Sequence, residues 1–167
     1  MDSSRSALPL LDKASADFIQ HHVTITVAAR DARNIPAIAR AFGCSVSADY
    51  RSVTVFLAPL RATAVLKNLR DNGVIAVVVS RPRTHETLQL KGAVTTIQRI
   101  SPQQGQIMAK YLHSFMEELT GMGYKPVITD SFAPEVNEDC LAVSFEPAAV
   151  FVQTPGPHAG QRLEPRP

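Results

Sequence analysis

The most informative hydrophobic pattern of the chain lies between residues 74 and 97. Val74–Val79 is an uninterrupted apolar run that is too short to span a membrane and lacks helical periodicity, so it predicts a strand buried on both faces. After a polar turn, Thr87–Lys91 alternates between apolar and polar residues, as a second strand does. Gly92 interrupts this alternation before Val94–Ile97 resumes it, which indicates a bulge or corner where a strand bends around a small closed barrel.

The N-terminal part of the chain alternates between apolar stripes of helical spacing and runs of period two. Gly43 falls inside one of the extended runs and predicts a bulge there. In order, we expect a helix at Leu8–Gln20, strands at His22–Ala29, Ile38–Ser47 and Arg51–Leu57, and a helix at Arg61–Asn72.

The C-terminal part begins with the clearest helix of the sequence, Ser101–Gly121. Ser101 is a natural N-cap and Gln104 completes a capping box three residues later. Its apolar stripe of Ile, Met, Tyr, Phe and Leu side chains predicts core or subunit contact. An alternating strand through residues 141–145 and an extended segment at Ala149–Gln153 follow.

These elements predict a mainly β protein, a β-barrel with flanking helices. We expect one domain over residues 1–153, with a short N-terminal helix. Residues 154–167 contain four prolines and little to bury, so they predict an extended arm that is dispensable for folding.

The composition narrows the classes of function. The 17 basic residues barely exceed the 15 acidic ones and are scattered along the chain, which argues against a nucleic-acid surface. No apolar run reaches membrane length and no signal-type apolar segment follows the first residues, so a cytoplasmic protein is expected. Cys44 and Cys140 lie far apart without metal-ligand spacing and predict two buried thiols.

No standard catalytic motif occurs in the sequence, so no catalytic residue is predicted. The five histidines share no ligand spacing with acidic or thiol partners, and no metal site is expected. Four basic residues beside predicted strands are candidates for binding a phosphate, or else ordinary solvated charges: Arg40, Arg51, Arg61 and Lys91.

The order of elements resembles the pyridoxamine 5′-phosphate oxidase-like family, the FMN-binding split β-barrels. The resemblance runs from about Phe18 to Gln153 and is strongest in Arg40–Leu57 as strand–turn–strand and in TLQLKGAVTTI at Thr87–Ile97. It implies FMN as the cofactor and places residues of this chain at the family's cofactor-binding positions. Those positions correspond to Arg40 or its competitor Arg51 for the phosphate, Arg61 and Thr63 at a helix start, and Thr87 on the later strand.

The resemblance further implies a homodimer with FMN in a groove between the subunits. Such a protein passes hydride or electrons between a donor and a small-molecule substrate. The chain contains no tryptophan and thus lacks the family's Trp-containing substrate segment, which argues against pyridoxamine phosphate as the substrate. The alternative is a non-enzymatic split barrel or one that binds or degrades haem.

Overall fold

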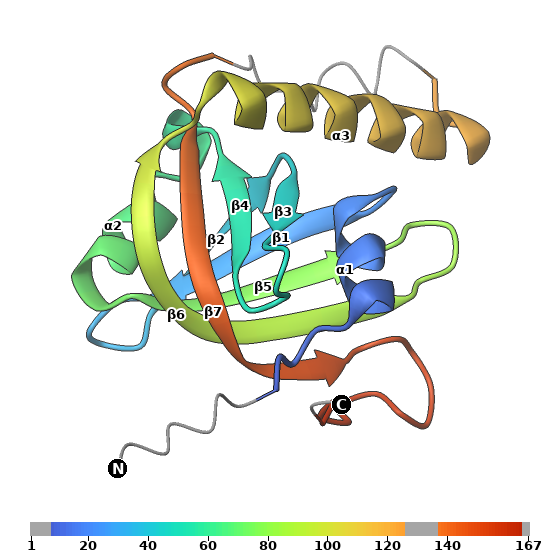
Figure 1. Ribbon diagram of the computed structural model, residues 1–167, viewed down its shortest axis with the longest axis horizontal. Helices are drawn as coiled ribbons and strands as arrows, with labels where there is room; N and C mark the ends of the chain where they lie inside the picture. The colour runs from blue at the N-terminus through green and yellow to red at the C-terminus, as the bar shows by residue number, and fades with distance from the viewer. Residues whose placement is uncertain (1–7, 126–136, 165–167) are drawn as a thin grey trace.

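The computed structural model of the chain describes residues 8–125 and 137–164. The described residues form a seven-stranded antiparallel sheet, three α-helices and one short 3₁₀-helix (Figure 1). The strands are β1 (Thr24–Arg30), β2 (Pro36–Ala41), β3 (Cys44–Val46), β4 (Val53–Leu57), β5 (Val74–Ser80), β6 (Thr87–Arg99) and β7 (Leu141–Val152). The helices are α1 (Lys13–Gln20), η1 (Pro59–Arg61), α2 (Thr63–Asn72) and α3 (Pro102–Gly121).

The sheet curls until its two edges meet. Its strand order is β2-β1-β5-β6-β7-β4-β3, so the two edge strands follow one another directly in the sequence. Phe42 and Gly43 connect these two strands and pair with Phe56 of β4: the Phe42 N–H donates to the Phe56 carbonyl at 2.8 Å, and the Phe56 N–H donates to the Gly43 carbonyl at 3.1 Å. These bonds tie the start of β3 to β4 at the point where β2 ends. The β-barrel with flanking helices predicted from the sequence is confirmed.

The prediction of one strand over Ile38–Ser47 is wrong. The segment divides at Gly43 into β2, which pairs with β1, and β3, which pairs with β4. Gly43 has φ +125°, a conformation that side-chain-bearing residues rarely adopt and that turns the chain from one sheet edge to the other. Only the short β3 therefore forms the expected hairpin with β4.

The continuous apolar run of β5 predicted a strand buried on both faces, and this prediction is wrong. Ile75, Val77 and Val79 are each 1% exposed and point into the core, whereas Val74 is 42% exposed on the opposite face. β5 forms backbone hydrogen bonds with β1 on one side and β6 on the other, and no described element covers the face of β5 that points away from the core. A run of apolar residues thus marks a strand with one face in the core and one face on the surface.

The bend predicted at Gly92 lies in the middle of β6, which continues through it as one strand (Figure 1). The pairing with β7 shifts there, because Lys91 faces Ala149 and Gly92 faces Pro147, leaving Ala148 as an extra residue. The backbone of Glu146 approaches so closely that a Cβ at position 92 would collide with its carbonyl oxygen. The two segments predicted after residue 140 likewise form the single strand β7.

The three helices begin where side chains or turns fix their first residues. α1 starts at Lys13 rather than at Leu8, because the Asp12 carboxylate accepts the Ser15 N–H at 2.8 Å. The helix expected from Arg61 divides into η1 and α2. The capping box predicted for α3 is confirmed, since Ser101 and Gln104 exchange hydrogen bonds of 3.2 and 2.8 Å.

α3 lies across one end of the barrel (Figure 1). Its side chains Met108, Tyr111 and Phe115 are buried between the helix and the barrel, and the Tyr111 hydroxyl donates to the Val23 carbonyl at 2.7 Å. Other members of its apolar stripe, such as Leu112 and Met116, are only half-buried. No helix within the described ranges combines the length and the apolarity needed to cross a bilayer.

The C-terminal segment turns back instead of extending away. β4 pairs only with the first half of β7, which leaves the second half with an open edge. Residues 160–163 run along that edge: the Val152 N–H donates to the Gln161 carbonyl at 2.9 Å, and the Leu163 N–H donates to the Val150 carbonyl at 2.8 Å. Leu163 also packs against the core. The segment therefore lies along the edge of β7 and forms an isolated β-bridge between Arg162 and Phe151.

The composition of residues 154–167 predicts that deleting them leaves the free energy of unfolding unchanged. From the contacts in the structure, we predict instead that the deletion lowers it. The deletion removes the backbone hydrogen bonds to β7 and the packing of Leu163, a loss of about 2–4 kcal/mol. Urea unfolding would measure it. Leu163→Ser should reproduce part of the loss, and Leu60→Ser, at a side chain 96% exposed, should have little effect. An unchanged midpoint for the deletion would show that the pairing is marginal.

Gly92→Ala should cost about 2–3 kcal/mol, because the added methyl group displaces the backbone of β7. The matched control is Gly105→Ala in α3, where the nearest atom to the new Cβ is 3.8 Å away and the helix gains about 0.5–1 kcal/mol. Thermal unfolding of both variants measures the difference. Equal melting temperatures would mean that β7 can move away from position 92 at no cost.

Candidate functional site

The side of the sheet that faces away from the core forms one continuous surface. In β1, Ile25, Val27 and Ala29 point inward, so the alternate residues point outward. The strand register aligns the outward residues of neighbouring strands in rows. Three of these rows define what we call the outer face: Thr24, Ser80 and Thr87; Arg40, Thr26, Val78, Gln89 and Phe151; and Ile38, Ala28, Ala76, Lys91 and Ala149.

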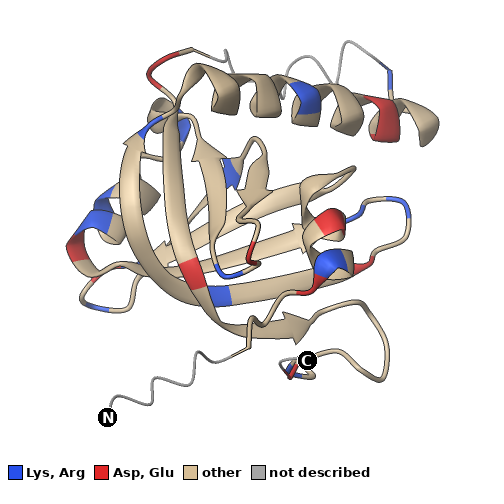
Figure 2. Cartoon of the chain, in the orientation of Figure 1, with Lys and Arg blue, Asp and Glu red and all other residues tan. Residues whose placement is uncertain are grey.

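The outer face is apolar to weakly polar and carries positive charge only. Its charged residues are Arg40 and Lys91, and its three rows contain no carboxylate. Charged side chains elsewhere lie mainly on helices and connecting loops (Figure 2). Arg40 and Lys91 are three strands apart, which separates their backbones by about 14 Å at about 4.8 Å per strand. A surface of this kind suits an extended ligand with an anionic group.

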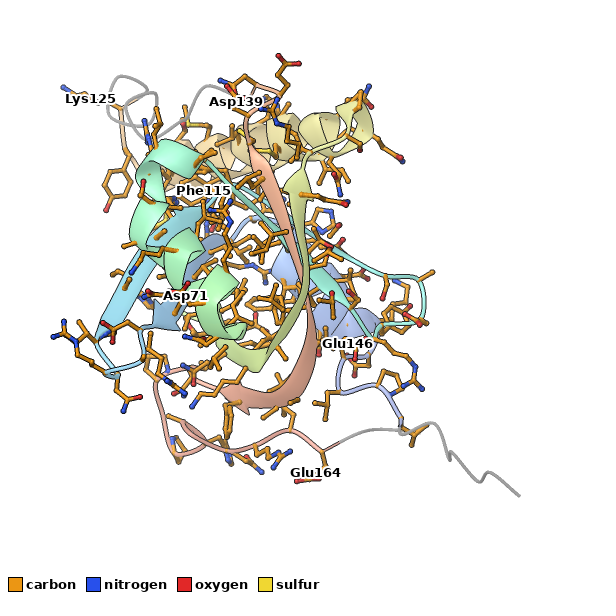
Figure 3. The ribbon with its side chains drawn as sticks, turned by 90° about the vertical axis from the view of Figure 1, so that its left-hand side faces the viewer. Asp71, Phe115, Lys125, Asp139, Glu146 and Glu164 are labelled. Carbon is orange, nitrogen blue, oxygen red and sulfur yellow. The ribbon has the colours of Figure 1, made fainter. Side chains whose placement is uncertain are left out.

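Arg40 stands at the β2 edge of the outer face, where α3 reaches it. Its Cζ lies 4.6 Å from the centroid of the Phe115 ring, and Phe115 points from α3 toward the barrel (Figure 3). Burial raises the pKa of the neighbouring Tyr111 above its usual range, and the charge of Arg40 partly opposes that shift. The aromatic contact fixes the position of the half-buried guanidinium group.

Arg61 lies close to the same end of the barrel. Its Cζ is 5.9 Å from the centroid of the Phe42 ring. Phe42 follows Arg40 by two positions, with the inward-pointing Ala41 between them, so Phe42 and Arg40 lie on the same side of the chain. Each of the two predicted phosphate-binding arginines therefore lies over an aromatic ring, Arg40 over Phe115 and Arg61 over Phe42.

The start of α2 adds backbone donors next to Arg61. Its N-cap residue is Ala62, which has no side chain able to accept a hydrogen bond from the first turn. The hydroxyl of Thr63, another predicted site residue, donates to the Pro59 carbonyl at 3.2 Å. First-turn N–H groups of this kind, together with the helix dipole, favour an anion.

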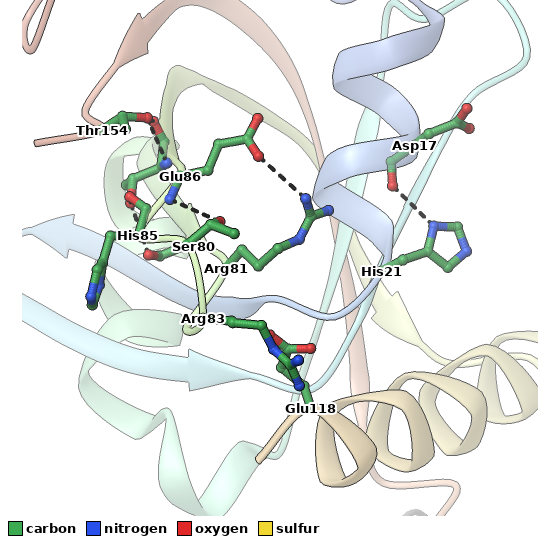
Figure 4. A network of polar contacts seen from close by, with 11 residues as sticks. Asp17, His21, Ser80, Arg81, Arg83, His85, Glu86, Glu118 and Thr154 are labelled. Carbon is green, nitrogen blue, oxygen red and sulfur yellow. Dashed lines mark hydrogen bonds and ion pairs between the residues drawn. The ribbon is translucent and has the colours of Figure 1, made fainter. Parts of the chain in front are cut away.

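Thr87 lies on the first row of the outer face, within a network of short polar contacts at the turn between β5 and β6. Its hydroxyl lies 2.8 Å from the Ser80 hydroxyl, and its backbone N–H donates to the Thr154 hydroxyl at 3.0 Å. Figure 4 shows this network beside the Arg81–Glu86 ion pair. Thr87 thus fixes the edge of the outer face and joins it to the C-terminal segment.

Lys91 lies over the Phe151 ring, with its Nζ 5.2 Å from the ring centroid. It borders a groove of about 340 Å³ whose floor includes the small side chains of Ala28 and Ala76. Arg30 lines the same groove from the end of β1. Small floor residues between two cations leave room for a flat molecule against the sheet.

Arg51 does not join this group. It is exposed in the β3–β4 loop, where its backbone N–H donates to the Asp49 carboxylate at 3.2 Å. Hydrogen bonds from Ser47 and Arg51 lower the pKa of Asp49. The Arg51 side chain lines a hollow of about 440 Å³ near Glu146 that shares no residue with the groove beside Lys91. Of the two competing arginines, Arg40 is the one on the outer face.

Several residues that line this surface are not among the site residues named from the sequence. Thr26 and Gln89 occupy the same row as Arg40, and Arg30 lines the groove. Strand alternation predicts that Thr26 and Gln89 point away from the core. Their common row follows only from the register of four strands, which a single sequence does not specify.

The cysteines offer no exposed nucleophile. Cys44 and Cys140 are both buried and neither forms a disulfide. Burial raises the pKa of Cys44 to about 12, and its thiol donates to the Ile19 carbonyl at 3.0 Å. Among the residues that the structure describes, no three His, Cys, Asp or Glu side chains gather as metal ligands.

Comparison with solved structures identifies the fold. An F420 reductase superposes with a TM-score of 0.54 at 14% identity, over 84% of this chain and 98% of that protein. A protein from Lactobacillus delbrueckii assigned as a pyridoxamine 5′-phosphate oxidase gives 0.53 at 11% identity, over 90% and 99%. HupZ from Group A Streptococcus gives 0.52 at 17% identity, over 90% and 99%. The sequence matches no protein-family model and no curated protein.

At these identities the likeness establishes architecture and nothing finer. The coverage is nearly complete for all three neighbours, so the superposition includes the whole barrel rather than a shared fragment. The split-barrel resemblance predicted from the sequence is confirmed at the level of the fold.

Proposed function

We propose that this chain, a split barrel of the pyridoxamine 5′-phosphate oxidase-like type, is an FMN-dependent oxidoreductase. In this proposal it acts in the cytoplasm as a homodimer, and the flavin lies in a groove between the outer face of one subunit and its partner. The observation that carries the proposal is Arg40, held over the Phe115 ring at the edge of an outer face whose three rows contain no carboxylate, with Arg61 over Phe42 as the second cation.

The donors at these two arginines fit a phosphate group. Arg40 and Arg61 each present a permanently charged, planar guanidinium next to an aromatic ring. The first turn of α2 follows Arg61 directly and lacks a capping side chain. The charge, the geometry of the donors and the helix dipole all favour a doubly charged anion.

The remainder of the outer face fits the planar, amide-rich ring system of a flavin. Thr26 and Gln89 offer a hydroxyl and an amide beside the apolar Val78, in the row that leads away from Arg40. Thr87 and Lys91 flank that row on β6. These side chains would bind and orient the ring, and a partner subunit would exclude water from it.

FMN, when bound, supplies hydride or single-electron transfer, so the chain itself needs no acid–base pair for the redox step. Its residues hold the cofactor, and Lys91 contributes a positive charge near the ring. The substrate is a small molecule that the groove admits beside the flavin.

The uncovered apolar residues of the outer face support the dimer. Ile38 on β2 is 73% exposed in the third row, and Val74, at the start of β5 beyond that row, is 42% exposed; β1 lies between the two strands. The half-buried side chains of α3, including Leu112 and Met116, add to the apolar surface available to a partner.

Light scattering at micromolar concentration should therefore give about twice the chain mass of 18.1 kDa. Ile38→Glu places a charge in the proposed interface and should shift the protein toward the monomer. Lys67→Glu, at a side chain 75% exposed on α2, is the matched control and should remain dimeric. A monomeric wild type would remove the groove between subunits.

Titration with FMN and riboflavin tests the cofactor. A charge-assisted contact to phosphate contributes about 1.5–3 kcal/mol. Arg40→Ala or Arg61→Ala should thus weaken FMN binding by roughly 10- to 150-fold, at about 1.4 kcal/mol per decade. Riboflavin, which lacks the phosphate, should lose little affinity. Arg33→Ala, at an exposed arginine of the β1–β2 loop, is the control and should bind both ligands as the wild type does.

The possible results separate the alternatives. Equal losses for FMN and riboflavin would assign the two arginines a structural role. Unchanged FMN affinity in both variants would place the phosphate elsewhere. A wild type that binds no flavin but develops a Soret band on titration with haem would support the haem-binding alternative.

A further inference from the structure

A second cationic site lies outside the outer face, where β4, β6 and β7 end near α2. It is a cavity of about 580 Å³, within the size range of small-molecule sites. Three arginines line it: Arg61, Arg70 and Arg99. They come from η1, from the last turn of α2 and from the end of β6, so segments far apart in the sequence converge here.

The balance of charge in this cavity favours an anion. Among its described lining residues the only carboxylate is Asp139, which lies 3.4 Å from Arg99. The side chains of this ion pair are 70% and 68% exposed, so water screens the attraction and a ligand can replace it at little cost. Arg70 makes no ion pair with any residue in the described part of the chain, although Lys67, on the same helix, pairs with Asp71.

The walls of the cavity are apolar. Ala58 and Leu141 contribute hydrocarbon surface, and Leu60 stands at the cavity with 96% of its surface exposed. An exposed leucine beside three guanidinium groups suits a ligand with an apolar body and an anionic group.

We propose that this cavity binds an organic anion, a phosphate monoester or a carboxylate with an apolar body, at a site separate from the proposed flavin groove. The guanidinium groups of Arg70 and Arg99 would hold the anionic group, and the walls at Ala58, Leu60 and Leu141 would cover the apolar body. The inference does not depend on FMN. Arg61 lines the cavity and also contacts Phe42, so the test uses the other two arginines.

The probe is 1-naphthyl phosphate, with uncharged 1-naphthol as its matched control, titrated by fluorescence into the protein both with and without excess FMN. The wild type should bind the phosphate at least about tenfold more tightly than the naphthol, as expected for one charge-assisted contact. The double variant Arg70→Gln, Arg99→Gln should lose that preference. Lys67→Gln, a charge removal on the exposed side of α2, should retain it.

Three results would overturn the proposal: equal binding of the two probes, a preference that survives in the double variant, or displacement of the probe by excess FMN. Circular dichroism confirms that the variants are folded. FMN titration of the same double variant keeps the two proposals apart, because the flavin affinity should be unchanged when the preference for the anionic probe is lost.

Discussion

The structure depends on how the chain crosses from one edge of the sheet to the other at Phe42 and Gly43. A sheet with two open edges would expose unpaired backbone groups, and closing it requires the edges to meet without strain. Gly43 permits the left-handed turn, and a side chain there would press on the Phe56 and Tyr111 side chains, 3.2 and 3.3 Å from the added Cβ. The turn that closes the sheet therefore also packs against Tyr111 of α3.

Closure decides which surface is available for function. The inward residues of the strands fill one core, so the barrel interior is packed. α2 packs against β1 and β2, and α3 covers one end. No element of the described ranges covers the outer face, which combines apolar residues with positive charge. The proposed site is thus the surface that the described elements of one chain leave open.

Local sequence signals predicted the elements better than their pairing. The capping box of α3 and the bend at Gly92 depend on residues close together in the sequence, and both were predicted correctly. The division at Gly43 and the return of residues 160–163 to β7 depend on contacts between distant segments. The same holds for the proposed site: the sequence offered Arg40, Arg61, Thr87 and Lys91 as candidates, but their placement on the fold required the strand register and the aromatic contacts.

The cations of the proposed phosphate site are positioned through α3. Arg40 contacts Phe115 of this helix, and Arg61 contacts Phe42, which packs in one cluster with Met108 of the same helix. α3 is in turn held by the Tyr111 bond to Val23 and by the ion pair between Arg83 and Glu118, at 3.5 Å. A displacement of α3 would move both guanidinium groups together, since each rests on a ring that the helix fixes. If the proposed phosphate site is correct, the position of α3 sets the position of its two arginines through Phe115 and Phe42.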